Sequence, residues 1–309
     1  MKVAVFHCCL VLDPCSAAYL TMDTKGRDYV KQQLPLIGLG TWEIRDRNVI
    51  FDIVDAALGC GYRMIDTAEL YGNEAFIGEA LKQYLPKYGL KREDIFITSK
   101  LQTSNQGADK ARPAVEGTLK ALGVDYLDLF LIHWPGTGFD PTPFDAKLRA
   151  ESWDVLEDFY KTGKLKAIGV SNYEKKHLDE LLAKATVLPA LNQCEYHPYF
   201  MQPDLIEYCK EKGIIFQAYS SLGSPYSNAK LMEDNLIKQM AEKYKCSTAQ
   251  FLLAWAINQG IGVLPRSSKA NHVRDNFKAI NIHIDPKDVQ LVCQIKESHK
   301  YCWDPTKIA

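Results

Sequence analysis

The sequence has no block of charge of one sign and no long apolar run. Its 37 lysines and arginines nearly balance its 38 aspartates and glutamates. No Lys/Arg-rich run exists that could neutralise a row of phosphates or anionic lipid headgroups. No apolar run reaches the roughly 18 residues that a membrane span requires. We therefore expect neither nucleic acid nor a membrane as a partner.

The sequence also lacks the cysteine spacing of a disulfide framework or a zinc site. Its nine cysteines are odd in number and scattered, and a chain of 309 residues does not need disulfides to fold. Cys8, Cys9 and Cys15 have no CxxC spacing and no nearby pair of further ligands, so we expect no metal. Four cysteines inside apolar patterns are expected to be small buried side chains: Cys60, Cys194, Cys209 and Cys293. This usage indicates a reducing, cytoplasmic compartment.

The first 18 residues have only part of the pattern of a secretory signal peptide. Lys2 precedes an apolar run from Val3 to Leu12, but the basic region is one residue deep and His7 interrupts the run. We expect residues 1–18 to be an N-terminal extension of unknown role, and residues 19–309 to form the folded domain.

From about Leu36 onward, short apolar runs alternate with amphipathic helical stretches, and no long linker interrupts them. This alternation is typical of repeated βαβ units and a parallel sheet. Helical stretches end on glycines, as at Gly123 and Gly163. Eight runs are candidate strands: Leu36–Leu39, Met64–Asp66, Ile95–Lys100, Leu127–His133, Ala167–Val170, Ala190–Cys194, Ile214–Ala218 and Gly262–Leu264.

Eight strands, each joined to the next by a helix, predict an α/β fold of the closed (β/α)8 or TIM-barrel type, as a single domain. The alternative is an open doubly wound sheet, which should carry G-x-G-x-x-G in its first strand-to-helix turn. Residues 38–42 read GLGTW, so the third glycine is missing. We therefore favour the barrel.

Four polar residues end or follow candidate strands: Asp66, Tyr71, Lys100 and His133. In such a barrel the chemistry belongs at the C-terminal ends of the strands. A charged Lys100 near the barrel mouth needs a counter-ion, and Asp66 on the neighbouring strand is the natural partner. This pair would place an ammonium group beside Tyr71.

These groups suit the reduction of a carbonyl. A phenol with a pKa near 10 is a poor proton donor at neutral pH, and we expect the Lys100 ammonium to lower the pKa of Tyr71. Tyr71 would then act as a general acid, while His133 donates a hydrogen bond to the carbonyl oxygen. Because each residue alone more often has a packing or ion-pair role, only their joint order indicates catalysis.

Four stretches resemble the motifs of the aldo-keto reductases. Residues 61–74 read GYRMIDTAELYGNE and resemble the first signature of that family. Residues 169–172 (GVSN), 191–193 (LNQ) and 264–277 (LPRSSKANHVRDNF) are similar to its later motifs, in the same order. The likeness covers nearly everything from Tyr19 to the end of the chain.

The resemblance implies an NADP(H)-dependent reductase that binds its cofactor without a Rossmann motif. It implies a catalytic tetrad of Asp66, Tyr71, Lys100 and His133, with Tyr71 as the proton donor. The substrate-binding residues would be Trp42, Tyr71, His133 and Trp134. The cofactor-binding residues would be Thr41, Trp42, Asp66, Ser171, Asn172, Gln193, Tyr219, Ser220, Leu222, Ser224, Pro265, Arg266, Ser267, His272 and Asn276.

The resemblance also implies how this set divides along the cofactor. Ser171, Asn172 and Gln193 would hold the nicotinamide carboxamide, and Tyr219 would stack on the ring. Residues 220–224 would cross the pyrophosphate and offer backbone N–H groups and hydroxyls as donors.

The adenosine end departs from the family pattern. The family usually has Lys after the Pro of the last strand and Arg six residues later, where this chain has Arg266 and His272. Arg266 can bind a 2′-phosphate with two hydrogen bonds and Ser267 can add a hydroxyl, but histidine offers less charge than arginine. We expect a weakened preference for NADPH, with NAD(H) tolerated. Asn276, beside Asp275, resembles the residues that hold the adenine.

The expected substrate is a small carbonyl compound. Trp42, Trp134 and Phe139 would form an apolar wall, and the short segments 136–147 and 298–309 suggest an open pocket. Small aldehydes, methylglyoxal, sugar aldehydes and prostaglandin-type carbonyls all suit such a pocket. The resemblance implies a monomer.

A different class of function is a cofactor-binding but non-catalytic or structural member of the same fold. The complete tetrad argues against it, and turnover would distinguish the two, because a structural protein binds NADPH without consuming it. A metal-dependent hydrolase is a third class, which lacks support because no cluster of His and carboxylates follows the strands.

Overall fold

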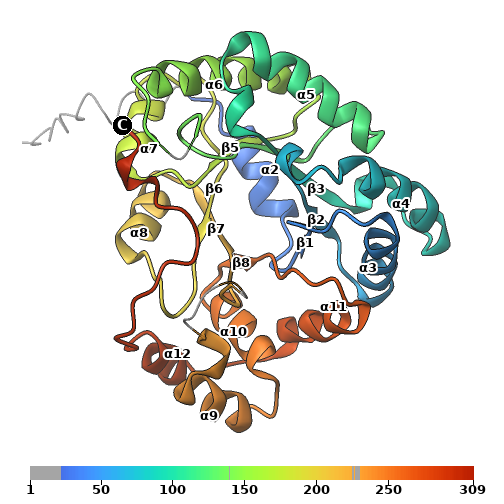
Figure 1. Cartoon of the computed structure of the whole chain (residues 1–309), viewed down its shortest axis with the longest axis vertical. Coiled ribbons are helices and arrows are strands. Elements are labelled where there is room, and N and C mark those ends of the chain that lie inside the picture. Colours follow the sequence, from blue (N-terminus) through green and yellow to red (C-terminus); the bar gives the residue numbers. More distant parts are fainter. Residues whose placement is uncertain (1–21, 139, 225, 227–229) are drawn as a thin grey trace, which may run out of the picture.

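The computed structural model describes residues 22–138, 140–224, 226 and 230–309. The predicted extension at residues 1–18 and the predicted wall residue Phe139 lie outside this described part. Figure 1 shows the strands gathered at the centre of the molecule, with helices arranged around them.

Eight parallel strands form one sheet in chain order. They are β1 (Leu39–Gly40), β2 (Met64–Asp66), β3 (Phe96–Leu101), β4 (Leu129–Ile132), β5 (Ile168–Ser171), β6 (Leu191–Glu195), β7 (Ile215–Tyr219) and β8 (Gly262–Val263). Parallel bridges from Ile37 to Val263 and from Gly40 to Arg266 join the last strand to the first. The sheet is therefore closed, which confirms the predicted barrel and excludes the open doubly wound alternative.

Helices surround the strands as the alternation predicts (Figure 1). The α-helices are α2 (Lys25–Gln33), α3 (Arg47–Cys60), α4 (Glu74–Lys87), α5 (Ala108–Leu122), α6 (Asp145–Lys161), α7 (Lys175–Leu182), α8 (Pro203–Glu211), α9 (Asn235–Lys243), α10 (Thr248–Ile257), α11 (Ala270–Phe277) and α12 (Pro286–Val292). Gly123 ends α5 in the left-handed region at φ 65°, and Gly163 follows α6 at φ 77°. Both predicted helix ends are therefore confirmed. Glycine suits these positions because a residue with a side chain would be strained at a positive φ.

One end of the barrel is filled by apolar side chains. Met64, Phe96, Leu129 and Leu191 are the first residues of β2, β3, β4 and β6, and they form one buried cluster. Val30 of α2 belongs to the same cluster, so this helix covers the N-terminal ends of the strands. The polar chemistry is left to the opposite end.

Two sequence expectations need correction. The first strand covers Leu39–Gly40 instead of Leu36–Leu39, because the residues before it pair with β8 only at the bridge of Ile37. Cys60 and Cys293 are only partly buried, since each lies at a helix end, whereas Cys194 and Cys209 are buried as predicted.

The described ranges contain neither a metal-binding cluster nor a membrane-spanning helix. No group of three or more His, Cys, Asp or Glu side chains within the described ranges is placed to hold a metal ion. No helix in those same ranges is long and apolar enough to cross a membrane.

Candidate active site

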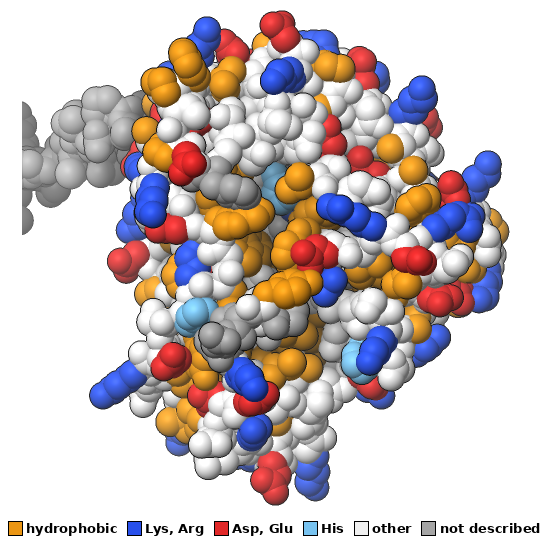
Figure 2. Space-filling model, in the orientation of Figure 1, with side chains coloured by type: hydrophobic (Ala, Val, Ile, Leu, Met, Phe, Trp, Pro, Cys, Tyr) orange, Lys and Arg blue, Asp and Glu red, His pale blue; other side chains and the backbone are white. Residues whose placement is uncertain are grey.

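The structure places all four predicted catalytic residues at the C-terminal ends of neighbouring strands. Asp66 is the last residue of β2, Lys100 precedes the last residue of β3, and His133 directly follows β4. Tyr71 ends the short 3-10 helix Glu69–Tyr71 after β2. Figure 2 shows hydrophobic side chains gathered around a hollow near the centre of the face seen in Figure 1.

The Lys100 ammonium donates hydrogen bonds to three groups of the site. Its Nζ donates to Asp66 Oδ1 at 2.6 Å, to the Thr67 carbonyl at 3.0 Å and to the Tyr71 hydroxyl at 3.2 Å. Lys100 is fully buried, and Asp66 is 4% exposed. The predicted ion pair and its contact with the phenol are therefore present.

Asn73 fixes the loop that carries Tyr71. Gly72 ends the 3-10 helix in the left-handed region at φ 67°. The buried Asn73 amide then donates to the Thr41 carbonyl at 2.9 Å and accepts from the Thr67 hydroxyl at 2.6 Å. The sequence motif contains Asn73, but nothing in the pattern showed that it ties this loop to the end of β1.

His133 stands beside Tyr71 at the barrel mouth. Their ring centroids are 5.6 Å apart, with the planes at 72°. The main chain of His133 is held on both sides, because its N–H donates to the Leu101 carbonyl at 3.2 Å and its carbonyl accepts from Asn172 Nδ2 at 3.0 Å. Its Nδ1 is buried and has no partner among the described residues. The position of the His133 ring is therefore fixed, and its Nδ1 has no hydrogen-bond partner among the described residues.

The expected lowering of the Tyr71 pKa is wrong in this structure. Burial of the phenol raises its pKa above the ordinary value, the Lys100 ammonium opposes this, and the Asp66 carboxylate adds to the rise. The error came from weighing the neighbouring cation without the loss of hydration. Tyr71 therefore keeps its proton throughout the neutral range.

His133 and Lys100 are shifted in opposite directions. Burial, with a contribution from the Lys100 charge, holds the pKa of His133 well below its ordinary value. Burial also disfavours the charged form of Lys100, but Asp66 and Tyr71 outweigh it and raise the Lys100 pKa. At neutral pH the site therefore contains a neutral imidazole, a neutral phenol and an ammonium–carboxylate pair.

The residues predicted to hold the nicotinamide form one hydrogen-bonded group beside the tetrad. The Ser171 hydroxyl donates to the Gln193 carbonyl at 2.7 Å, and the Tyr219 hydroxyl donates to Asn172 Oδ1 at 2.6 Å. The Gln193 amide donates to Asp66 Oδ2 at 2.8 Å. β5, β6 and β7 thus bring hydroxyl and amide groups next to the buried ion pair.

Three further polar groups support these positions from inside the barrel. The Thr41 hydroxyl donates to the Asp66 carbonyl at 2.9 Å, and the Pro265 carbonyl accepts from Gly40 N–H at 3.1 Å. Gln217, which the sequence analysis did not single out, accepts from Gln193 Nε2 at 3.0 Å. Thr41 and Pro265 therefore have structural contacts in addition to their predicted cofactor role.

The segment predicted to cross the pyrophosphate lies between β7 and the end of β1. Ser220 has a left-handed backbone at φ 52°, and Leu222 packs against the core. The Ser224 hydroxyl accepts from Tyr226 N–H at 3.3 Å, and the Tyr226 hydroxyl donates to Glu43 Oε2 at 3.0 Å. Glu43 thus connects this segment to the turn after β1.

Arg266 is also engaged by that turn. Its Nε donates to the Trp42 carbonyl at 2.8 Å, and its Nη2 lies 3.7 Å from Glu43 Oε2. Ser267 accepts from Lys269 N–H at 3.0 Å. Glu43 was not predicted from the sequence, although an acidic residue directly after Trp42 in the first strand-to-helix turn is a detectable signal.

The two remaining predicted adenosine residues differ in exposure. His272 is exposed on α11, whereas Asn276 on the same helix is 6% exposed. Asp275, between them, forms an ion pair with Lys278 at 2.7 Å. The Asn276 side chain is therefore buried, whereas the His272 side chain faces solvent.

The predicted substrate wall has one buried and one exposed tryptophan. Trp134 is 3% exposed and Trp42 is 38% exposed. Trp303 of the C-terminal segment meets Trp134 edge to face, with centroids 6.1 Å apart. The C-terminal segment therefore adds a third aromatic residue to this wall.

Glu195, at the end of β6, anchors the C-terminal segment. It accepts from Lys300 Nζ at 2.8 Å, from Tyr301 N–H at 2.6 Å and from Cys302 N–H at 3.1 Å. Burial alone would raise the pKa of Glu195, but the hydrogen bond from His197 and the Lys300 charge lower it to about 2. This anchor was not predicted, because its sequence signal is a single charged residue at the end of an apolar strand.

Comparison with known proteins identifies the family. The Aldo/keto reductase family model matches residues 36–297. The Xenopus tropicalis protein named aldo-keto reductase family 1 member A1 is 38% identical over 291 residues, which cover 88% of this chain and 89% of that relative. Glyoxal reductase of Bacillus subtilis is 35% identical over 291 residues, which cover 93% of this chain and 99% of that protein.

Two further comparisons agree. The 9,11-endoperoxide prostaglandin H2 reductase of Trypanosoma cruzi is 34% identical over 273 residues, covering 88% of this chain and 92% of that relative. The crystal structure of MGS-M4, an aldo-keto reductase enzyme from a Medee basin deep-sea metagenome library, superposes with a TM-score of 0.81. It is 34% identical, with 89% of this chain and 96% of that chain covered. The chain belongs to the aldo/keto reductase family.

Proposed function

We propose that this chain reduces aldehydes or ketones to alcohols with NADP(H), and that Tyr71 supplies the proton. The observation that carries the proposal is the buried contact of the Lys100 ammonium with both the Asp66 carboxylate and the Tyr71 hydroxyl. An ammonium at that position stabilises the phenolate that remains after proton transfer.

The donor groups around the tetrad fit a dinucleotide. The nicotinamide carboxamide needs both donors and acceptors, which Ser171, Asn172 and Gln193 provide next to Asp66. Tyr219 supplies a ring beside them, and Arg266 supplies the guanidinium for a phosphate. When bound, the reduced cofactor supplies the hydride.

His133 and Tyr71 act on the carbonyl oxygen. The neutral imidazole of His133 donates a hydrogen bond to this oxygen, which polarises the carbonyl as the hydride adds to carbon. The proton of the Tyr71 hydroxyl then passes to the same oxygen, so that the product is the neutral alcohol and Tyr71 becomes a phenolate held by Lys100. A proton from solvent restores the phenol.

The substrates that suit the mouth are small carbonyl compounds. Trp42, Trp134 and Trp303 offer apolar surface beside the two polar donors. Glyoxal reductase and the prostaglandin H2 reductase among the relatives support dicarbonyls and prostaglandin-type compounds as candidates, together with sugar aldehydes and other small aldehydes. We further propose a cytoplasmic monomer.

The test is the absorbance of reduced nicotinamide during turnover of a carbonyl panel that includes methylglyoxal, 4-nitrobenzaldehyde and xylose. Tyr71→Phe keeps the ring and removes the hydroxyl, so we expect kcat to fall by roughly 10²- to 10⁴-fold. Cofactor affinity, measured by quenching of protein fluorescence, should change by less than about twofold.

Two results would contradict the proposal. Full activity of Tyr71→Phe would remove Tyr71 from the reaction. NADPH binding without turnover of any carbonyl in the panel would support the cofactor-binding, non-catalytic alternative.

A further inference from the structure

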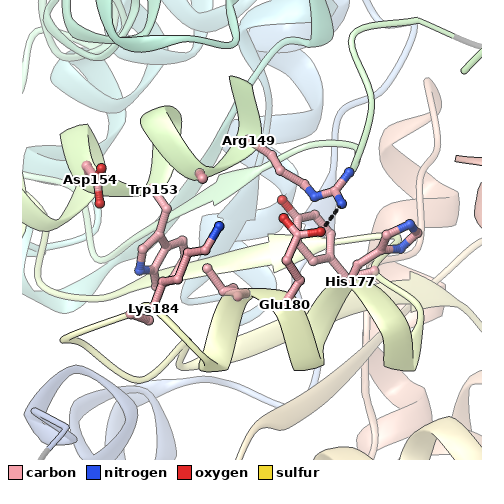
Figure 3. Close-up of a pocket in the computed structure, with 10 residues that line it drawn as sticks. Arg149, Trp153, Asp154, His177, Glu180 and Lys184 are labelled. Carbon is pink, nitrogen blue, oxygen red and sulfur yellow. Dashed lines mark hydrogen bonds and ion pairs between the residues drawn. The ribbon is translucent and has the colours of Figure 1, made fainter. Parts of the chain in front are cut away.

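A cavity lies on the outside of the barrel between α6 and α7. Its volume is about 130 Å³, and none of the residues that line it belongs to the candidate active site. An engineered protein cavity of about 150 Å³ takes up benzene, so a space of this size accommodates a single six-membered ring. Figure 3 shows Trp153 and Lys184 on one side of the cavity and the linked pair Arg149 and Glu180 on the other.

The apolar part of the cavity wall comes from both helices. Trp153 and Ala150 lie on α6, Leu181 lies on α7, and Ala185 follows α7. The Trp153 indole N–H is already used, because it donates to Glu157 Oε1 at 2.9 Å. The indole therefore offers only ring surface to a ligand, as do the aliphatic side chains around it.

The polar part of the wall contains an unused donor and an unused acceptor. Tyr173 is 1% exposed, and its hydroxyl has no hydrogen-bond partner among the described residues. Glu180, whose side chain is 32% exposed, binds Arg149 through Oε2, and no protein group within the described part of the chain bonds its Oε1. A buried hydroxyl without a partner is costly, so a ligand that satisfies it is favoured.

The Glu180 carboxylate is also held in place. Its partner Arg149 is 3% exposed and donates in addition to the Pro135 carbonyl at 3.3 Å and to the main-chain oxygen of Ala309 at 2.6 Å. These contacts fix the guanidinium, and through it the carboxylate, before any ligand binds. Such preorganisation reduces the entropy lost on binding.

The charges around the cavity offset one another, with Arg149 and Lys184 opposite in sign to Glu180 and Asp154, so a ligand of either charge is repelled by one pair. A carboxylate would face Glu180 and Asp154, and an ammonium would face Arg149 and Lys184. A hydroxyl group, in contrast, accepts one hydrogen bond and donates another, which matches one free donor and one free acceptor.

We propose that this cavity binds a neutral single-ring compound that carries a hydroxyl group. The ring lies against Trp153 and Leu181. The hydroxyl accepts from the Tyr173 hydroxyl and donates to Glu180 Oε1.

The experiment follows the indole N–H signal of Trp153 in ¹⁵N-labelled protein during a titration with phenol. The signal is assigned by its loss in Trp153→Phe. In the wild type it should shift saturably. Tyr173→Phe removes one hydrogen bond to the ligand and should weaken binding about fivefold. Ala150→Leu fills the cavity and should abolish the saturable shift.

Matched variants and charged analogues complete the experiment. Ala183→Leu adds the same side chain at an exposed position that does not line the cavity and should titrate like the wild type. If Ala150→Leu does not fold, Ala185→Leu fills the cavity from the other side. No shift with phenol in the wild type, or an unchanged titration in the filled variant, would overturn the site.

The ligand class has its own control. If benzoate or benzylamine shifts the same signal with a lower dissociation constant than phenol, the assignment to a neutral hydroxyl compound is overturned. Because this readout involves no turnover, it is independent of the proposed reductase activity.

Discussion

Two ion pairs at the mouth of the barrel differ in burial. Lys100 and Asp66 lie 2.6 Å apart with side chains 0% and 5% exposed, whereas Arg266 and Glu43 lie 3.7 Å apart with side chains 33% and 35% exposed. The inner pair is almost completely shielded from water, so removing one partner leaves a buried charge without its counter-ion. The outer pair is hydrated, so its partners can be changed at little cost. For the proposed function, the inner pair is therefore suited to holding the proton donor in one position. The outer pair is suited to adjusting the preference between cofactors.

Among the variants that test the difference between the two ion pairs, Lys100→Met is expected to have the largest effect. It leaves Asp66 buried without its cation and removes the charge that, in the proposed mechanism, stabilises the Tyr71 phenolate. We expect a loss of roughly 3 to 5 kcal/mol in the free energy of unfolding, measured with urea. We also expect a fall in kcat of about a thousandfold.

The double variant Asp66→Asn/Lys100→Met separates the two effects. It removes both buried charges, so it should recover much of the stability while the low kcat remains. Recovery of activity in this double variant would contradict the role given to the ammonium.

Glu195→Gln extends the comparison to another buried carboxylate. The pKa of Glu195 falls from 4.5 to about 2 on folding, so its contribution to stability is present above about pH 4.5 and is lost as the pH falls toward 2. This depression corresponds to roughly 3 kcal/mol. At neutral pH the variant should therefore be less stable than the wild type, and near pH 2 the two should converge.

Urea unfolding at both pH values checks this expectation. Glu233→Gln is the matched control, because Glu233 is 60% exposed and pairs with Lys230 at 3.4 Å. It should change stability by less than about 1 kcal/mol at either pH. An equal effect of the two variants at neutral pH would show that burial does not set the strength of these contacts.

The pH dependence of kcat/KM sharpens the description of the inner pair. The proposed reaction needs the protonated phenol, and burial raises the pKa of Tyr71 above 10.0, so we expect activity to be lost only as the pH rises through the Tyr71 pKa. We expect kcat/KM to stay level from about pH 6 to 9 and to fall tenfold per pH unit above the Tyr71 pKa. A decline centred between pH 7 and 8, which this pKa direction excludes, would show that Lys100 outweighs burial.

The smallest expected effect is that of Glu43→Gln at the outer pair. The change frees the Arg266 guanidinium and removes a negative charge near the expected position of the 2′-phosphate. NADPH should bind about threefold to fivefold more tightly, by fluorescence quenching, with NADH unchanged. The wild type should prefer NADPH over NADH by less than about a thousandfold in kcat/KM.

An exposed pair elsewhere provides the control for Glu43→Gln. Glu79 pairs with Arg47 at 2.8 Å on the helices α4 and α3, and Glu79→Gln should leave both cofactor affinities unchanged. Equal tightening of NADPH and NADH by Glu43→Gln would mean that Glu43 acts on the Tyr226 contact instead of on Arg266.

The order of the strands and the positions of the tetrad were predictable from the sequence. Each strand is a short apolar run, and Asp66, Lys100 and His133 end or follow such runs, so a parallel barrel brings them to the same edge. The hydrophobic periodicity of the sequence identifies the strands and their ends because it depends only on residues that are close together in the chain.

The supporting contacts were not predictable in the same way. Asn73, Glu43 and Glu195 act between elements far apart in the sequence, and no local pattern shows which of them will meet. The direction of the Tyr71 pKa failed for a related reason. It is the balance of burial against a nearby charge, and the degree of burial is known only once the barrel is assembled.

The apolar layer beneath α2 has a consequence for the order of binding. Because Val30 and the first residues of the strands fill one end of the barrel with apolar side chains, we expect the molecules of the proposed reaction to enter and leave at the opposite end. Two molecules that share one opening cannot pass each other. If the proposed cofactor and the carbonyl compound both use that end, we expect the one bound deeper to arrive first and depart last, so that the plugged end of the barrel sets the sequence of arrival and departure at the other end.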